Sequence, residues 1–110
     1  MTFRYVHVAP DFGGAGTFPV WERTPGFDGG EVDPDTSEFP EQLIQEFLAW
    51  NEKWETVINS DPGGTDEERL EFDREGRALA KRLRTFLGRD ARVTYEISAG
   101  PENGRIIEAR

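Results

Sequence analysis

The sequence has no cysteine and a single histidine among its 110 residues, and these absences exclude several kinds of chemistry. Without cysteine the chain forms no disulfide and no thiolate metal site. The one histidine, His7, supplies neither a catalytic triad nor the several ligands of a zinc site, so we interpret it as structural or merely exposed. We therefore predict no catalytic residue, no bound metal and no cofactor.

Long apolar runs are also missing. No stretch approaches the ~18 consecutive apolar residues of a membrane span, and the start of the chain lacks the apolar run of a signal peptide. These features predict a soluble, cytoplasmic protein. The run Gly13-Gly14-Ala15-Gly16 lacks both the lysine of a P-loop and the spacing of a dinucleotide fingerprint, so we interpret it as a turn.

Basic residues are scarce: 13 Lys and Arg stand against 22 Asp and Glu, which gives a formal net charge of −9. A field of this sign repels nucleic acids and anionic membranes and attracts basic partners. The alternative is that the net negative charge only keeps the protein soluble. The distribution of the charges along the chain is therefore more informative than their sum.

The chain does contain two amphipathic helical patterns, in residues 40–58 and 66–87. Apolar residues recur in both at steps of three and four, which places them on one helix face. Thr65 and Glu68 form a capping box at the start of the second helix, and Gly88 is a natural end. The first half of this helix is acidic and its second half is basic, which complements the helix dipole. Gly76 lies on the apolar face of the second helix, although glycine costs about 1 kcal/mol relative to alanine inside a helix. This predicts that Trp50 or Trp54 of the first helix approaches closely at that position.

Strand patterns flank the helices. Residues 2–8 and 92–98 are rich in β-branched and aromatic residues, and 17–22 and 105–108 are candidate edge strands. The pattern predicts an α+β fold, with a two-helix hairpin packed on one face of a three- to four-stranded antiparallel sheet. We expect one domain over residues 1–110, with a long acidic loop at about 23–39 that apolar side chains hold to the body.

The charges are segregated along the chain. Eight acids and no base lie between Arg23 and Lys53. An acidic run beside aromatic residues is typical of a docking surface for a basic protein, although a solvated acidic loop is the alternative. The predicted partner-binding residues are Trp21, Asp28, Glu31, Asp33, Asp35, Glu38 and Glu41.

The carboxylates of the acidic segment 28–35 are of the type that binds calcium. The segment fails the EF-hand pattern because Gly30 and Val32 stand where the loop needs oxygen ligands. Incidental calcium binding stays an alternative that rests only on carboxylate density.

Several segments together resemble a group of small actinobacterial proteins, over about residues 20–97. Some of those proteins are similar to immunity proteins of polymorphic or contact-dependent toxin systems. The segments that carry the resemblance are Val20-Trp21-Glu22, Glu31-Val32-Asp33-Pro34-Asp35, Pro40-Glu41-Gln42-Leu43-Ile44, Trp50-Asn51, Trp54-Glu55, Phe72-Asp73-Arg74-Glu75-Gly76-Arg77-Ala78-Leu79-Ala80 and Leu87-Gly88.

This resemblance implies a non-enzymatic cytoplasmic protein that binds a toxin. Together with the acidic run, it leads to the hypothesis of an immunity protein that covers the active site of a basic toxin domain, with a nuclease as the obvious candidate. Two alternatives from other classes remain: a small enzyme that uses carboxylates on an unknown substrate, and a structural or homodimeric subunit. The sequence does not fix the oligomeric state or the strand order.

Overall fold

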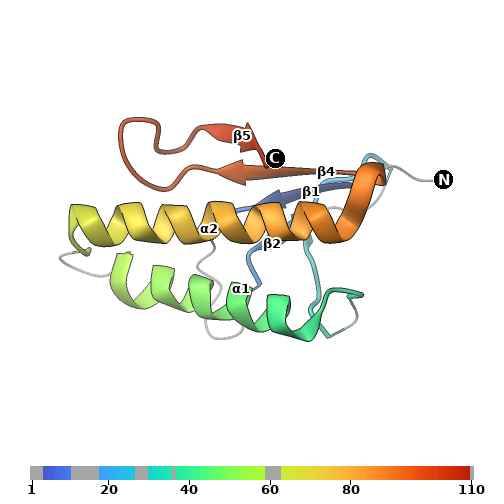
Figure 1. Cartoon of the computed structure of the whole chain (residues 1–110), viewed down its shortest axis with the longest axis horizontal. Coiled ribbons are helices and arrows are strands. Elements are labelled where there is room, and N and C mark those ends of the chain that lie inside the picture. Colours follow the sequence, from blue (N-terminus) through green and yellow to red (C-terminus); the bar gives the residue numbers. More distant parts are fainter. Residues whose placement is uncertain (1–3, 11–17, 27–29, 36, 59–62, 110) are drawn as a thin grey trace.

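Five short strands form one sheet, and two helices pack against one of its faces (Figure 1). The structure is a computed structural model and describes residues 4–10, 18–26, 30–35, 37–58 and 63–109. In chain order the elements are β1 (Arg4–Val8), β2 (Val20–Glu22), β3 (Gly30–Glu31), α1 (Glu41–Lys53), a π-helical turn (Trp54–Ile58), α2 (Asp66–Leu87), a 3-10 turn (Gly88–Asp90), β4 (Ala91–Glu96) and β5 (Ile106–Glu108). The predicted α+β fold is confirmed.

The sheet has the order β3-β2-β1-β4-β5 and is mixed, so the prediction of a wholly antiparallel sheet of three or four strands was wrong in this detail. The central strands β1 and β4 run parallel, with His7 opposite Thr94, while the other neighbours are antiparallel. Parallel neighbours need a long crossover, and the loop with both helices provides one here. The strand β3 was not foreseen, because its two residues, Gly30 and Glu31, have low strand propensity.

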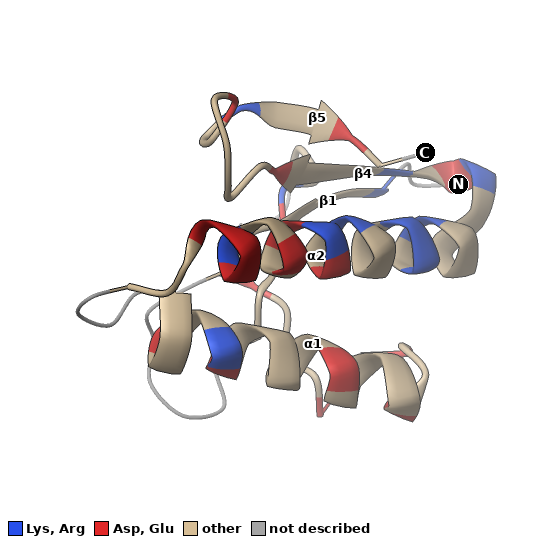
Figure 2. Ribbon diagram, turned by 60° about the vertical axis from the view of Figure 1, so that its left-hand side comes forward, with Lys and Arg blue, Asp and Glu red and all other residues tan. Residues whose placement is uncertain are grey.

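The two helical patterns form a hairpin as predicted, and both helices lie on the same side of the sheet (Figures 1 and 2). The two ends of α2 agree with the prediction: Thr65 caps its start and Gly88, at φ 78°, ends it. Side chains from both helices and the central strands make one core, whose largest members include Trp50, Phe47, Phe72 and Tyr95. Phe86, expected on the buried stripe, is instead 42% exposed.

Gly76 lies where α2 meets both α1 and the sheet. A Cβ atom there would stand 2.6 Å from Tyr95 Oη and closer still to Trp50 Cζ2. The predicted close approach of Trp50 is therefore confirmed, and Tyr95 of β4 adds a second contact that the sequence did not indicate.

The long loop before α1 is held to the body, as expected, by buried side chains. Val32 and Phe39 are 9% and 5% exposed, and Thr24 Oγ1 accepts a hydrogen bond of 2.9 Å from the Tyr5 amide. Phe27, which we also expected to contribute, lies outside the described residues, as do Asp28 and the run 13–16.

The capping box at the start of α2 provides a first testable prediction. Glu68 N donates to Thr65 Oγ1 over 3.1 Å, and Thr65 N donates to Glu68 Oε1 over 3.0 Å. Replacing Thr65 with alanine leaves a helix N–H without its partner, so we expect a loss of about 1 kcal/mol in the free energy of unfolding, measured by urea denaturation. Thr85→Ala, an exposed threonine later in α2, should cost nothing; equal losses in the two variants would contradict the role of the cap.

Candidate protein-binding surface

Strand pairing brings together Trp21 and Glu31, two of the residues predicted to bind a partner. The two residues are register partners on β2 and β3, so their side chains are close cross-strand neighbours. Trp21 is half-buried: its Nε1 donates to the Ala9 carbonyl over 3.4 Å, and the Arg23 guanidinium lies 6.0 Å from its ring centroid. The tryptophan is thus held in place and remains partly exposed to solvent.

Three of the predicted acids lie together at the end of β3 and in the turn that follows it. Glu31, Asp33 and Asp35 line one depression of about 380 Å³ with Val32 and Pro34. Its backbone is held from both sides, because Val32 N donates to the Val20 carbonyl over 2.8 Å and Asp35 N donates to Asp33 Oδ1 over 2.9 Å. We call Trp21, Glu31, Asp33 and Asp35 the acidic surface.

The carboxylates of the acidic surface have no basic neighbour in the described part of the chain. No Lys, Arg or His nitrogen there lies within 4.0 Å of Glu31, Asp33 or Asp35. Glu31 Oε1 instead accepts the Phe18 amide, over 2.5 Å, and all three residues are exposed. Their negative charge therefore faces solvent.

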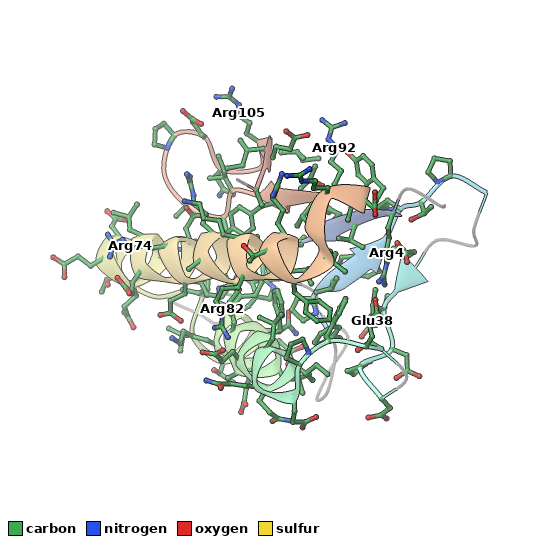
Figure 3. The ribbon with its side chains drawn as sticks, turned by 45° about the vertical axis from the view of Figure 1, so that its right-hand side comes forward. Arg4, Glu38, Arg74, Arg82, Arg92 and Arg105 are labelled. Atoms are coloured by element: carbon green, nitrogen blue, oxygen red, sulfur yellow. The ribbon has the colours of Figure 1, made fainter. Side chains whose placement is uncertain are left out.

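The other predicted acids do not line this depression. Glu38 forms an ion pair with Arg4, which also binds Glu22 over 3.0 Å (Figure 3). Glu41 begins α1 and accepts a hydrogen bond of 3.0 Å from Gln45 Nε2. Arg4 partly neutralises Glu38, and neither glutamate belongs to the depression that the other acids line. Asp28 lies outside the described residues.

The charge segregation seen along the sequence is partly undone in space, because bases of other segments approach the acids. Arg82 of α2 pairs with Glu46 of α1, and Arg4 of β1 pairs with Glu38. A second group of acids occupies the first half of α2 (Figure 2). The sequence pattern of that half was interpreted only as complementing the helix dipole.

His7 is the register partner of Trp21 and lies beside this end of the acidic surface, on the sheet face opposite the helices. It is 8% exposed, its Nδ1 lies 2.8 Å from Thr94 Oγ1, and it lines a depression of about 350 Å³ with Tyr5, Arg23, Thr94, Glu96 and Ile106. Burial, and secondly the charge of Arg23, lower the pKa of His7 below its usual value. The neutral ring is favoured, which agrees with a structural role.

Within the described residues, no three His, Asp or Glu side chains are grouped so that they could hold a metal ion. None of the helices in the same part of the chain combines the length and apolar character needed to cross a membrane.

Comparison with known proteins gives one family. The sequence model of the family described as "Serratia CdiI immunity protein-like" matches residues 5–98, which run from β1 past β4 and include both helices and the acidic surface. None of the curated proteins matches the chain. The resemblance to immunity proteins inferred from the sequence is confirmed, while the actinobacterial affiliation stays a prediction.

Proposed function

Because the chain belongs to the Serratia CdiI immunity protein-like family, we propose that it is an immunity protein that neutralises a cognate toxin by binding to it. The protein then acts by association and not by catalysis. Its toxin is a second protein chain, and the relevant property of the structure is a surface rather than a reactive site.

We further propose that the acidic surface binds a basic toxin domain and covers its active site. The observation that carries this proposal is the depression in which Glu31, Asp33 and Asp35 face solvent, next to the ring of Trp21. Among the described residues, these three carboxylates form no ion pair within 4.0 Å. Opposite charges accelerate association and select the partner, and half-buried tryptophans are common anchors at the centre of interfaces. Both features suit an inhibitor.

A nuclease is the candidate target. Enzymes that act on nucleic acids gather Lys and Arg to bind phosphates, and an acidic surface complements such a site. The complex would form in the cytoplasm, where the nucleic acids of the cell are attacked.

The test measures binding of a candidate toxin domain, taken from the genes next to this one, by calorimetry and by protection of cells that express it. Asp35→Lys should weaken binding by about 10-fold, mainly through slower association and with a changed salt dependence. The double variant Asp33→Lys with Asp35→Lys should weaken it by about 100-fold and abolish protection.

Glu102→Lys is the matched control, because it makes the same charge change in the turn before β5, at the opposite edge of the sheet from β3. It should bind almost as the wild type does. If Asp35→Lys and Glu102→Lys lose the same affinity, or if no basic protein is bound at all, the acidic surface is not the toxin site.

A further inference from the structure

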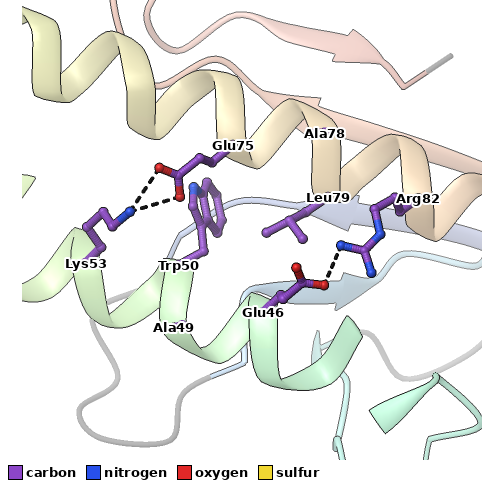
Figure 4. A pocket seen from close by; sticks show the side chains of 8 residues that line it. All are labelled: Glu46, Ala49, Trp50, Lys53, Glu75, Ala78, Leu79 and Arg82. Carbon is purple, nitrogen blue, oxygen red and sulfur yellow. Dashed lines mark hydrogen bonds and ion pairs between the residues drawn. The ribbon is translucent and has the colours of Figure 1, made fainter. Parts of the chain in front are cut away.

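A groove runs along the outer side of the helical hairpin, away from the acidic surface. Its first part has a volume of about 300 Å³ and is lined by both helices (Figure 4). The walls include Ala49 of α1 and Ala78 of α2, both exposed, and the floor is formed by Trp50 and Leu79, both buried. Two ion pairs cross the groove: Lys53 binds Glu75 over 2.9 Å, and Arg82 binds Glu46.

The groove continues toward the end of the hairpin. A second depression of about 450 Å³ shares Lys53 and Glu75 with the first, and Val57 and Ile58 provide its apolar part. From Glu46 to Val57 the groove follows α1 and then the π-helical turn for roughly 16 Å, at about 1.5 Å per residue. The π-helical turn Trp54–Ile58 lies at this end, and such turns are frequent at functional sites.

The charges around the groove are unequal. Its lining carries five acids against two bases, and three of the acids, Glu67, Glu68 and Glu71, lie at the end beside Val57. Lys53 and Arg82 are already paired with Glu75 and Glu46. Glu71 is paired with Arg74, which lies outside the lining, and Glu68 accepts the Thr65 amide, so the excess of negative charge is centred on Glu67. An occupant that brings positive charge therefore gains attraction, whereas an acidic one meets repulsion.

From this combination we propose that the hairpin groove binds a cationic amphipathic helix of a protein partner. Two antiparallel helices with small wall residues allow a third helix to approach closely, with its apolar side chains over Trp50, Leu79 and Val57. Lysines or arginines on its flank then reach Glu67 and Glu71. This surface is separate from the acidic surface, and the proposal does not depend on which toxin the protein binds.

The test uses the full chain, labelled with nitrogen-15, and a synthetic peptide of about 14 residues, long enough to span the groove as a helix. The peptide carries leucines at helical spacing and lysines on the flanks; one control has glutamates for the lysines, and another has the same composition in scrambled order. We expect amide shifts confined to the groove, around Ala49, Lys53, Val57, Glu71 and Ala78. Both control peptides should bind at least about 10-fold more weakly.

Two pairs of variants separate a groove from a general charge effect. The double variant Glu67→Lys with Glu71→Lys should weaken binding of the peptide by at least about 10-fold. The double variant Asp33→Lys with Asp35→Lys makes an equal change in net charge and should leave the peptide's affinity within about 2-fold of the wild type. Ala78→Gln fills the groove without adding charge and should also weaken binding, while Thr85→Gln at an exposed position outside the lining should not.

Several results would overturn the proposal: equal losses in the two charge variants, shifts on the acidic surface instead of the groove, or equal binding of the scrambled peptide. Groove resonances that move with the concentration of the protein alone would identify a second copy of the chain as the occupant and would overturn it too. Loss of toxin binding on Asp33→Lys with Asp35→Lys leaves this proposal unaffected, so the two surfaces are tested separately.

Discussion

Replacing Gly76 with valine is expected to destabilise the protein by more than about 3 kcal/mol, and replacing it with alanine by about 1–2 kcal/mol, both measured by urea denaturation. Helix propensity alone predicts the opposite for alanine, a gain of about 1 kcal/mol. The steric cost exceeds this gain because the new Cβ would stand 2.6 Å from Tyr95 Oη and 2.8 Å from Tyr95 Cε1, and would also meet Trp50.

Neither aromatic ring can move away easily. Trp50 is stacked on Phe72 with ring centroids 4.5 Å apart, and its Nε1 donates to the Phe72 carbonyl over 2.9 Å. Tyr95 is 1% exposed, and its hydroxyl is hydrogen-bonded to Asp73. Relief of the clash must therefore break contacts in the core.

The reverse substitution on the same helix is the control. Ala78→Gly, at an exposed position two residues further on, should cost about 1 kcal/mol through propensity alone. If Gly76→Ala stabilised the protein by the amount that Ala78→Gly loses, propensity would govern both positions and the close approach would be unimportant.

The helical hairpin could be predicted from the sequence because its signals are local. Apolar residues repeat at helical spacing, Thr65 and Glu68 mark one end of α2, and Gly88 marks the other. Gly76 was also informative, since a glycine on a buried stripe implies a near neighbour. These patterns operate within a few residues of one another, so tertiary context did not alter them.

The sheet was less predictable because strand direction depends on contacts between distant segments. Nothing within residues 4–8 or 91–96 indicates that these two strands run parallel; the path of the loop and both helices between them decides it. The same limit applies to charge. The sequence placed Glu38 and Glu46 in an uncompensated acidic run, but the fold brings Arg4 and Arg82 to them.

Four of the residues that the sequence assigned to partner binding are brought together by the fold, and their role in binding stays a prediction. Trp21 and Glu31 are ten residues apart, yet β2 and β3 pair them, and the turn after β3 places Asp33 and Asp35 in the same depression. The groove of the hairpin was missed because its acids, Glu67 and Glu71, were explained by the helix dipole. Their spacing of four residues placed them on one helix face, and that signal was available.

Asp73 is a residue whose importance for stability is visible only in the folded structure. It lies on α2 and is 6% exposed, and its Oδ1 accepts the Ser98 amide over 2.8 Å and the Tyr95 hydroxyl over 2.9 Å. Its Oδ2 accepts Arg77 Nε over 2.8 Å. Burial raises the pKa of the Tyr95 hydroxyl well above its usual value, so this group stays protonated and donates. One carboxylate thus links α2 to β4 and to the segment that follows it.

Replacing Asp73 with alanine should lower the free energy of unfolding by about 3 kcal/mol, because the buried Ser98 amide loses its acceptor. The Tyr95 hydroxyl keeps only the longer contacts to the Asp73 carbonyl, at 3.2 Å, and to Ser98 Oγ, at 3.3 Å. Tyr95→Phe should cost only about 1 kcal/mol, and the double variant less than the sum of the two, since both remove the same hydrogen bond. Glu71→Ala is the matched control: it removes an exposed glutamate of the same helix, paired with Arg74 on the surface, and should cost less than about 1 kcal/mol. Equal losses for Asp73→Ala and Glu71→Ala in urea denaturation would show that the buried carboxylate does not hold the helix to the sheet.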